Sequence, residues 1–178
     1  MIAAMSNLCA RGWKASFKIK SALKGIDASP ATRLKLFDTL VKPIICYGSE
    51  IWGAFNNLHS CESVDQFWKR LGNLPPENFQ IKFCKAILGV HSKACNTAVM
   101  GEVGRFPMFL YIIKSMMRYY QHIEDVKDDR PLLAAALETD RCLPSGKSWF
   151  GAMETILKLF GVKFDPSVGI DRIVSYIT

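Results

Sequence analysis

The sequence lacks the features that mark proteins of membranes and of the secretory route. No uninterrupted apolar run is longer than Met108 to Ile113, which is far shorter than the roughly 20 residues that a membrane-spanning helix requires. Residues 1–5 carry neither the positive start nor the long apolar region of a secretory signal. We therefore expect no membrane partner and an intracellular protein of the cytoplasm or nucleus.

Paired cysteines are also missing. None of the six cysteines takes part in a C-x-x-C motif, the spacing that zinc ribbons and redox sites use. The nearest approach to a metal half-site is His91 with Cys95, and no second pair completes it. We therefore expect reduced cysteines that mostly fill the core, and no metal or other cofactor.

The chain contains no useful alternation of apolar and polar residues, which is the pattern of a half-buried strand. Apolar residues recur instead at helical spacing between start and stop signals. Ser29 and Pro30 can open one helix, and Gly89 can end another that begins at Pro76. Pro43 has no N–H to donate, so it should kink or interrupt its helix. We predict an all-α fold, an irregular bundle of about seven or eight helices.

At 178 residues the chain is long enough for one well-filled core, so one compact unit, in one lobe or two, is expected. Within it we expect four consecutive segments. These are basic helices over 1–53, a loop or hinge over 54–76 with a short helix at 64–71, a helical core over 77–126, and a helical tail over 127–178 that ends with a helix at 170–177.

Acidic residues are scarce in the first quarter of the chain, where nearly all of the excess positive charge lies. The formal net charge is +7, and residues 1–42 hold eight Lys or Arg but only two acids, an excess of six. The remaining residues hold 15 basic and 14 acidic side chains. This asymmetry indicates that the N-terminal end meets a polyanion or an acidic partner.

The basic quarter also has helical order. Its predicted buried face consists of apolar residues that recur every four positions, Met5, Cys9, Trp13 and Phe17. Arg11, Lys14 and Lys18, spaced i, i+3 and i+7, fall nearly opposite that face and form a cationic ridge. Such a ridge can follow phosphates as sequence-independent positive charge, and an ordinary solvated helix face is the alternative.

No set of residues has the spacing of a catalytic site. Ser49 has no general base beside it, and no second carboxylate or histidine is placed to share a metal with Glu50. The adjacent Asp128 and Asp129 lie in polar surroundings typical of a helix end, whereas a polymerase Asp pair sits in a hairpin between apolar strands. We therefore expect no catalytic residues and no enzyme activity.

Three blocks follow one another along the chain, LFDTLVKPIICYGSEIWG at 36–53, FCKAILGV at 83–90 and NTAVMGEVGRFP at 96–107. In this order they resemble the region that follows the catalytic palm in non-LTR (LINE-type) retrotransposon reverse transcriptases. The preceding residues 11–23 resemble the helix that enters this region, and residues 126–178 fit the helical tail loosely, with Trp149 and Phe150 as the suggestive point. The residues that carry this family signature are Pro43, Tyr47, Gly48, Glu50, Trp52, Gly53, Gly89, Gly101, Glu102, Gly104 and Pro107.

The resemblance implies a thumb-like and C-terminal helical region, which in such enzymes holds the template–primer duplex against the palm. It implies an RNA/DNA hybrid or duplex as a sequence-tolerant partner, and the missing palm domain as a protein partner. Arg11, Lys14 and Lys18 are then the candidates for backbone contact. The sequence contains no fingers, no palm and no aromatic-x-Asp-Asp hairpin to hold two metal ions. We expect a non-catalytic nucleic-acid-binding fragment, and a helical protein-interaction scaffold is the alternative.

Overall fold

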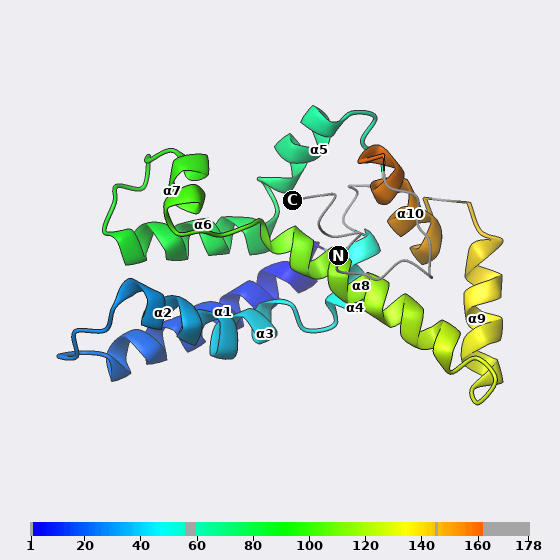
Figure 1. Ribbon diagram of the computed structural model, residues 1–178, viewed down its shortest axis with the longest axis horizontal. Coiled ribbons are helices and arrows are strands. Elements are labelled where there is room, and N and C mark those ends of the chain that lie inside the picture. The colour runs from blue at the N-terminus through cyan, green and yellow to red at the C-terminus, as the bar shows by residue number, and fades with distance from the viewer. Residues whose placement is uncertain (1, 56–59, 145, 162–178) are drawn as a thin grey trace. The chain divides into compact units, whose positions relative to one another are not determined.

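The computed structural model describes residues 2–55, 60–144 and 146–161, whose helices are shown in Figure 1. These residues form helices and no strand, which confirms the predicted all-α class. Apart from the single turns α3 (Lys42–Ile45) and α4 (Ser49–Trp52), eight helices run through the described residues. None of the helices in this part of the chain is long and apolar enough to cross a membrane. The helix predicted at 170–177 lies outside the described residues.

The helices group into two compact units, each assembled from two stretches of chain. Unit 1 comprises Met1–Tyr47 with Asn73–Met108, and unit 2 comprises Gly48–Gly72 with Phe109–Thr178. This grouping does not follow the order of the four consecutive segments expected from the sequence. The reason is that each unit gathers its apolar faces from stretches that are distant along the chain, which the order of segments does not reveal.

Unit 1 contains α1 (Ile2–Ala22), α2 (Pro30–Leu36), α3, α6 (Pro75–Leu88) and α7 (Asn96–Glu102). α1 packs against α3 and α6, and α7 packs on α6 (Figure 1). The core is aromatic, because the Phe79 ring lies 4.3 Å from Trp13 and 6.1 Å from Phe37, centroid to centroid. Phe37 and Phe79 are almost fully buried, so they anchor these helices by removing large apolar surfaces from water.

Pro43 determines the course of the chain between α2 and α3. α2 begins as predicted, because the Ser29 hydroxyl accepts the N–H of Thr32 at 3.2 Å. The helix then widens into a π-helical turn, Phe37–Val41, and restarts as α3 with Pro43 in its first turn. A proline removes one hydrogen bond and its ring crowds the carbonyl four residues earlier, so a wider preceding turn accommodates it. The predicted interruption is confirmed.

The buried face of α1 differs from the predicted one. Met5 and Cys9 are buried, but Trp13 is only half-buried and Phe17 is 66% exposed. Two small residues, Gly12 and Ser16, are buried in their place. A Cβ on Gly12 would lie 2.8 Å from Cγ1 of Ile45, so α1 approaches α3 closely at the position that lacks a side chain. This close approach rotates α1 and turns Phe17 to solvent.

Two polar contacts in unit 1 hold the loop that leads into α8 (Met108–Asp125). The Arg105 guanidinium donates to both carboxylate oxygens of Asp38, at 2.6 and 2.8 Å, and to the Leu34 carbonyl at 3.2 Å. The buried Glu77 carboxylate accepts the backbone N–H of Met108 at 3.1 Å. A negative group is favourable near the N–H groups that begin a helix, so Glu77 satisfies the N–H of Met108.

Unit 2 contains α4, the 3-10 turn η2 (Gly53–Phe55), α5 (Val64–Leu71), α8, α9 (Pro131–Arg141) and α10 (Trp149–Leu159). The short helix predicted at 64–71 is confirmed as α5. Its fully buried Phe67 meets the rings of Phe109 and Phe160 edge to face, at 5.1 and 5.0 Å. α8 and α10 supply the other large buried side chains, among them Ile112, Ile113, Met116, Met117 and Met153.

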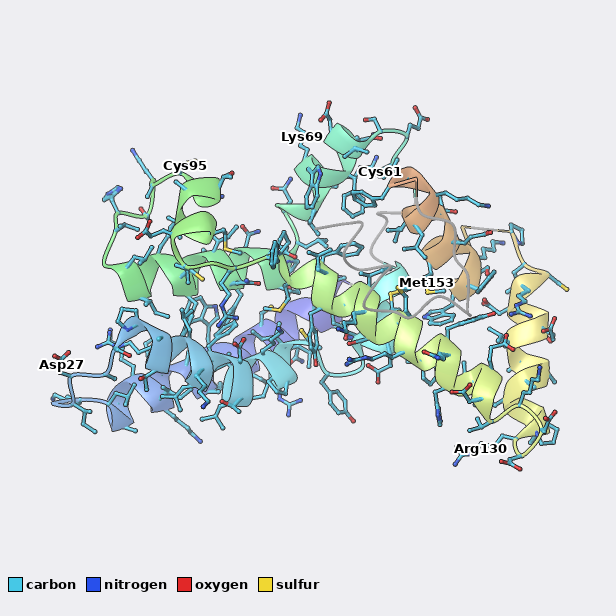
Figure 2. All side chains as sticks on the ribbon, in the orientation of Figure 1. Asp27, Cys61, Lys69, Cys95, Arg130 and Met153 are labelled. Atoms are coloured by element: carbon cyan, nitrogen blue, oxygen red, sulfur yellow. The ribbon has the colours of Figure 1, made fainter. Side chains whose placement is uncertain are left out.

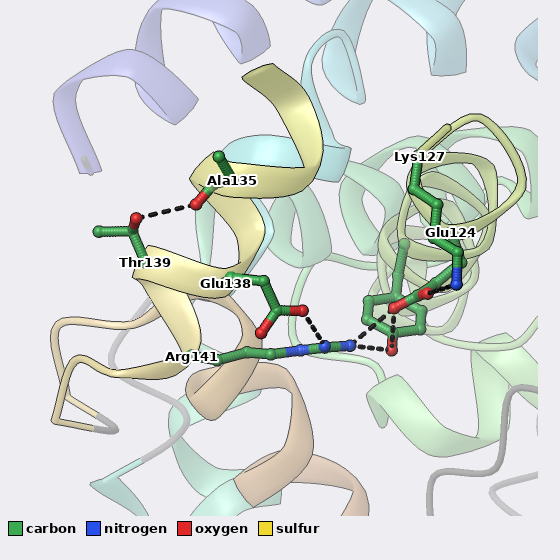
Figure 3. A network of polar contacts seen from close by, with 7 residues as sticks. Glu124, Lys127, Ala135, Glu138, Thr139 and Arg141 are labelled. Atoms are coloured by element: carbon green, nitrogen blue, oxygen red, sulfur yellow. Dashed lines mark hydrogen bonds and ion pairs between the residues drawn. The ribbon is translucent and has the colours of Figure 1, made fainter. Parts of the chain in front are cut away.

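Arg141 joins α9 to α8 within unit 2 (Figure 3). Its guanidinium donates to the Glu124 carboxylate at 2.7 Å and to the Tyr120 hydroxyl, and it lies over the rings of Tyr120 and Phe150. The Tyr120 hydroxyl in turn donates to Glu124 at 2.8 Å. The hydrogen bond from Tyr120 and the charge of Arg141 lower the pKa of Glu124. Burial, together with the hydrogen bond to Glu124, raises the pKa of Tyr120 to about 12.

We expect Glu124 to make the stability of unit 2 depend on pH. Because its folded pKa lies below the ordinary value of 4.5, its contribution is present above that value and is lost as the pH falls through the folded pKa. Glu124→Gln should therefore be less stable than the parent at neutral pH, and the difference should shrink below about pH 4. Urea unfolding followed by circular dichroism across this pH range measures the difference.

Glu138→Gln is the matched control, because Glu138 also pairs with Arg141 but its side chain is 67% exposed. Exposed ion pairs contribute little, so this variant should stay close to the parent across the same pH range. A Glu124→Gln deficit that is independent of pH would contradict the assigned role of the ionised carboxylate.

Candidate nucleic-acid interface

The cationic ridge predicted from the sequence lies on a single exposed helix face. Arg11, Lys14 and Lys18 all belong to α1, and all three are exposed. Along a helix that rises about 1.5 Å per residue, their Cα atoms are spaced about 4.5 and 6 Å along the axis. The ridge therefore presents three cations in one row.

The positive charge of α1 has no acidic counterpart on the helix itself. The first acidic residue of the chain is Asp27, beyond the end of α1 at Ala22. Lys20, in the last turn, and Lys24, in the turn that follows, are also exposed. Among the residues that the structure describes, the salt bridges involve cations outside α1. The outer face of α1 is therefore a local region of positive potential that attracts polyanions.

Phe17 belongs to this outer face, although the four-residue apolar spacing assigns it to the core. It lies three residues after Lys14 and three before Lys20, positions that neighbour it on a helix surface. The sequence did hold a signal for this, because Gly12 and Ser16 form a small-residue strip suited to close helix packing. Sequence reasoning missed it by weighting apolar residues alone.

Several residues of the family signature lie at helix boundaries. Gly48, Gly89 and Gly104 have left-handed φ values of 69°, 67° and 63°. Gly89 ends α6 as predicted, since only a residue without a Cβ adopts this conformation without strain. The other boundary residues are Pro43 in α3, Gly101 and Glu102 at the end of α7, and Pro107 directly before α8.

The two aromatic side chains between Tyr47 and Gly53 lie in opposite environments. Tyr47 is 75% exposed, so it does not plug the core, whereas Trp52 is buried. Glu50 contributes its backbone carbonyl, which accepts the indole N–H of Trp149 at 2.8 Å. Gly53 has a helical φ of −58°, and the chain continues from it into η2.

The residues considered for a metal site are engaged in other contacts. His91 Nδ1 accepts the backbone N–H of Lys93 at 3.1 Å. Cys95 is exposed just before α7 (Figure 2), where the backbone N–H groups of Ala98 and Thr97 lower its pKa. Within the described ranges, no group of three or more His, Cys, Asp or Glu side chains is placed to hold a metal ion.

The six cysteines are free thiols in two different settings. Cys9, Cys46, Cys61 and Cys84 are buried, whereas Cys95 and Cys142 are exposed. Burial raises the pKa of Cys9 to about 11 and that of Cys46 to about 12. The expectation of core cysteines therefore holds for four of the six.

The outer face of α1 offers charge and one aromatic ring, which suits binding to a polyanion. No known protein family, curated protein or solved structure matches this chain. The resemblance of the three sequence blocks to retrotransposon reverse transcriptases thus stays a prediction. The exposed cations of α1 are the observation that bears on function.

Proposed function

We propose that this chain is a non-catalytic fragment of a retroelement reverse transcriptase and binds template–primer nucleic acid through the cationic ridge of α1. The observation that carries this proposal is the exposed, acid-free row of Arg11, Lys14 and Lys18. Each cation that meets a phosphate releases condensed counterions, which makes the affinity favourable and salt-dependent. The ordered sequence blocks support the family, and the exposure of the row supports the role of these residues.

The mode of binding follows from the chemistry of the row. Lysine and arginine at a helix surface meet phosphate oxygens, which position a duplex but carry no sequence information. We therefore propose an RNA/DNA hybrid or duplex as the partner, bound with little sequence preference. The polymerase palm that the resemblance implies is the proposed protein partner.

Charge reversal of the ridge tests the proposal. Arg11→Glu/Lys14→Glu/Lys18→Glu should abolish retention of an RNA/DNA hybrid at moderate salt, since three attractions become three repulsions. Arg11→Gln/Lys14→Gln/Lys18→Gln should make the slope of log affinity against log salt concentration less steep by about three. This is close to one for each phosphate that the variant no longer neutralises. Fluorescence anisotropy of a labelled hybrid at several salt concentrations measures both effects.

A matched control separates the ridge from the overall charge. Arg118, Arg130 and Lys147 are exposed cations of unit 2, so their exchange for glutamate changes the net charge by the same amount. This control should keep most of the affinity. Equal losses in both triple variants would indicate non-specific attraction, and unchanged binding by the ridge variant would overturn the assignment of α1.

The alternative function, a helical protein-interaction scaffold, is favoured by apolar side chains exposed on unit 1. Leu40 is 51% exposed, Phe106 is 61% exposed and Tyr47 is 75% exposed. A scaffold would bind an acidic protein partner with a shallow dependence on salt, whereas phosphate contacts impose a steep one. The salt titration with a hybrid and with an acidic peptide therefore distinguishes the two functions.

A further inference from the structure

Phe17 is an exposed aromatic ring set among cations. Its side chain is 66% exposed on a helix whose Met5, Cys9, Gly12 and Ser16 are buried in unit 1. At about 100° per residue, Phe17 lies about 60° around the helix from Lys14 on one side and from Lys20 on the other. Lys24, seven residues on, continues the same line past the last turn. The ring is thus flanked by positive charge along the helix.

The position of the Phe17 ring is supported from within unit 1. Trp13, one turn earlier, is half-buried, and its ring centroid lies 4.3 Å from that of Phe79 in the core and 6.5 Å from that of Phe17. Trp13 therefore lies between the core and Phe17 and limits how far the Phe17 ring can fold back. Part of the apolar surface of Phe17 therefore stays in water, although its burial would be favourable.

We propose that Phe17 is a stacking platform for an unpaired base, and that α1 binds single-stranded nucleic acid with Lys14 and Lys20 on the flanking phosphates. This inference rests on the proposed function, because it requires that α1 contacts nucleic acid. A single strand presents both a flexible phosphate backbone and free base faces, which a cationic groove or ridge with an aromatic ring can bind together. Bases within a duplex are already stacked on one another, so Phe17 adds nothing to duplex binding.

The choice of partner follows from the combination of groups. An acidic helix or protein would use the cations but would not require an aromatic face between them. Stacking is tolerant of sequence because every base has a π-face, which agrees with a site that has no assembled set of base-reading side chains. The single strand that continues from a primed duplex fits both the ridge and the platform.

The test compares two oligomers that carry the same phosphates. One is an oligouridylate of about ten nucleotides, and the other is an abasic ribose-phosphate oligomer of equal length. The parent chain should bind the oligouridylate about ten-fold more tightly than the abasic oligomer. Phe17→Leu, which keeps an apolar side chain but removes the ring, should bring this ratio close to one and leave the abasic affinity unchanged. Phe17→Trp should restore the ratio or increase it.

Further variants separate the failure of this inference from the failure of the proposed function. Arg11→Gln/Lys18→Gln should weaken binding of both oligomers equally, because it removes charge and no ring. An unchanged ratio in Phe17→Leu would overturn the stacking platform and leave the cationic ridge intact. If the parent bound neither oligomer nor duplex, both proposals would be wrong. If Phe17→Leu weakened binding of an acidic helical peptide instead, the platform would belong to a protein interface.

Discussion

Replacing Phe79 by alanine should lower the free energy of unfolding of unit 1 by about 3–5 kcal/mol. Phe79 is 2% exposed, and its ring contacts those of Trp13 and Phe37 at the centre of the unit. The change removes the transfer free energy of a large apolar side chain and leaves a cavity that helices α1 and α6 cannot readily fill. A loss of this size is a large fraction of the stability of an ordinary domain, about 5–15 kcal/mol.

Peptide-resolved hydrogen exchange measures this effect, because it reports on unit 1 separately from unit 2. Peptides of α1 and α6 should lose protection. Phe17→Ala is the matched control, since it makes the same chemical change on α1 at a side chain that is 66% exposed. Its effect should stay within about 0.5 kcal/mol. Equal losses in the two variants would contradict the burial assigned to Phe79 and the exposure assigned to Phe17.

Gly53→Ala should destabilise unit 2 by about 1–3 kcal/mol, the usual cost of overpacking. Gly53 is buried, and a Cβ there would lie 2.6 Å from Cγ2 of Ile112 and 2.7 Å from Sδ of Met116. The thioether of Met116 can move, but Cγ2 of Ile112 branches directly beside the α8 backbone and can move little. Because the φ of Gly53 is −58°, the cost comes from contact alone and not from backbone strain.

Gly72→Ala in the same unit is the control for Gly53→Ala. Gly72 also has helical backbone geometry, and its nearest contact for an added Cβ is 3.6 Å, an ordinary van der Waals distance. Thermal unfolding should show a clear loss for Gly53→Ala and almost none for Gly72→Ala. In an Ile112→Ala background, which removes Cγ2, the added cost of Gly53→Ala should shrink. Additive costs in this double-mutant cycle would rule out the proposed clash.

Local signals in the sequence located several helix boundaries correctly. Ser29 caps α2, Gly89 ends α6 in a left-handed turn, and Pro43 interrupts its helix. These predictions succeed because each depends on hydrogen bonds and φ angles of a few neighbouring residues. One boundary shifted slightly, since α6 begins at Pro75 and not at the predicted Pro76.

The sequence predicted the charged residues of the candidate site, but it did not predict that the Phe17 ring is exposed there. Arg11, Lys14 and Lys18 share a face because helical spacing alone decides which side chains lie together. Whether that face meets solvent depends on the helices that cover the other side. Gly12 allows α3 to come close, and burial of Gly12 and Ser16 leaves Phe17 pointing outward.

The sequence by itself determined the all-α class, the helices around Ser29, Pro43 and Gly89, and a positively charged first helix, because these follow from local backbone chemistry and periodicity. Only the tertiary structure decided that stretches separated along the chain join into two units. It also decided that Gly53 serves close packing and not helix termination. Both outcomes depend on which surfaces fit together at van der Waals distance, and residue spacing carries no information about that fit.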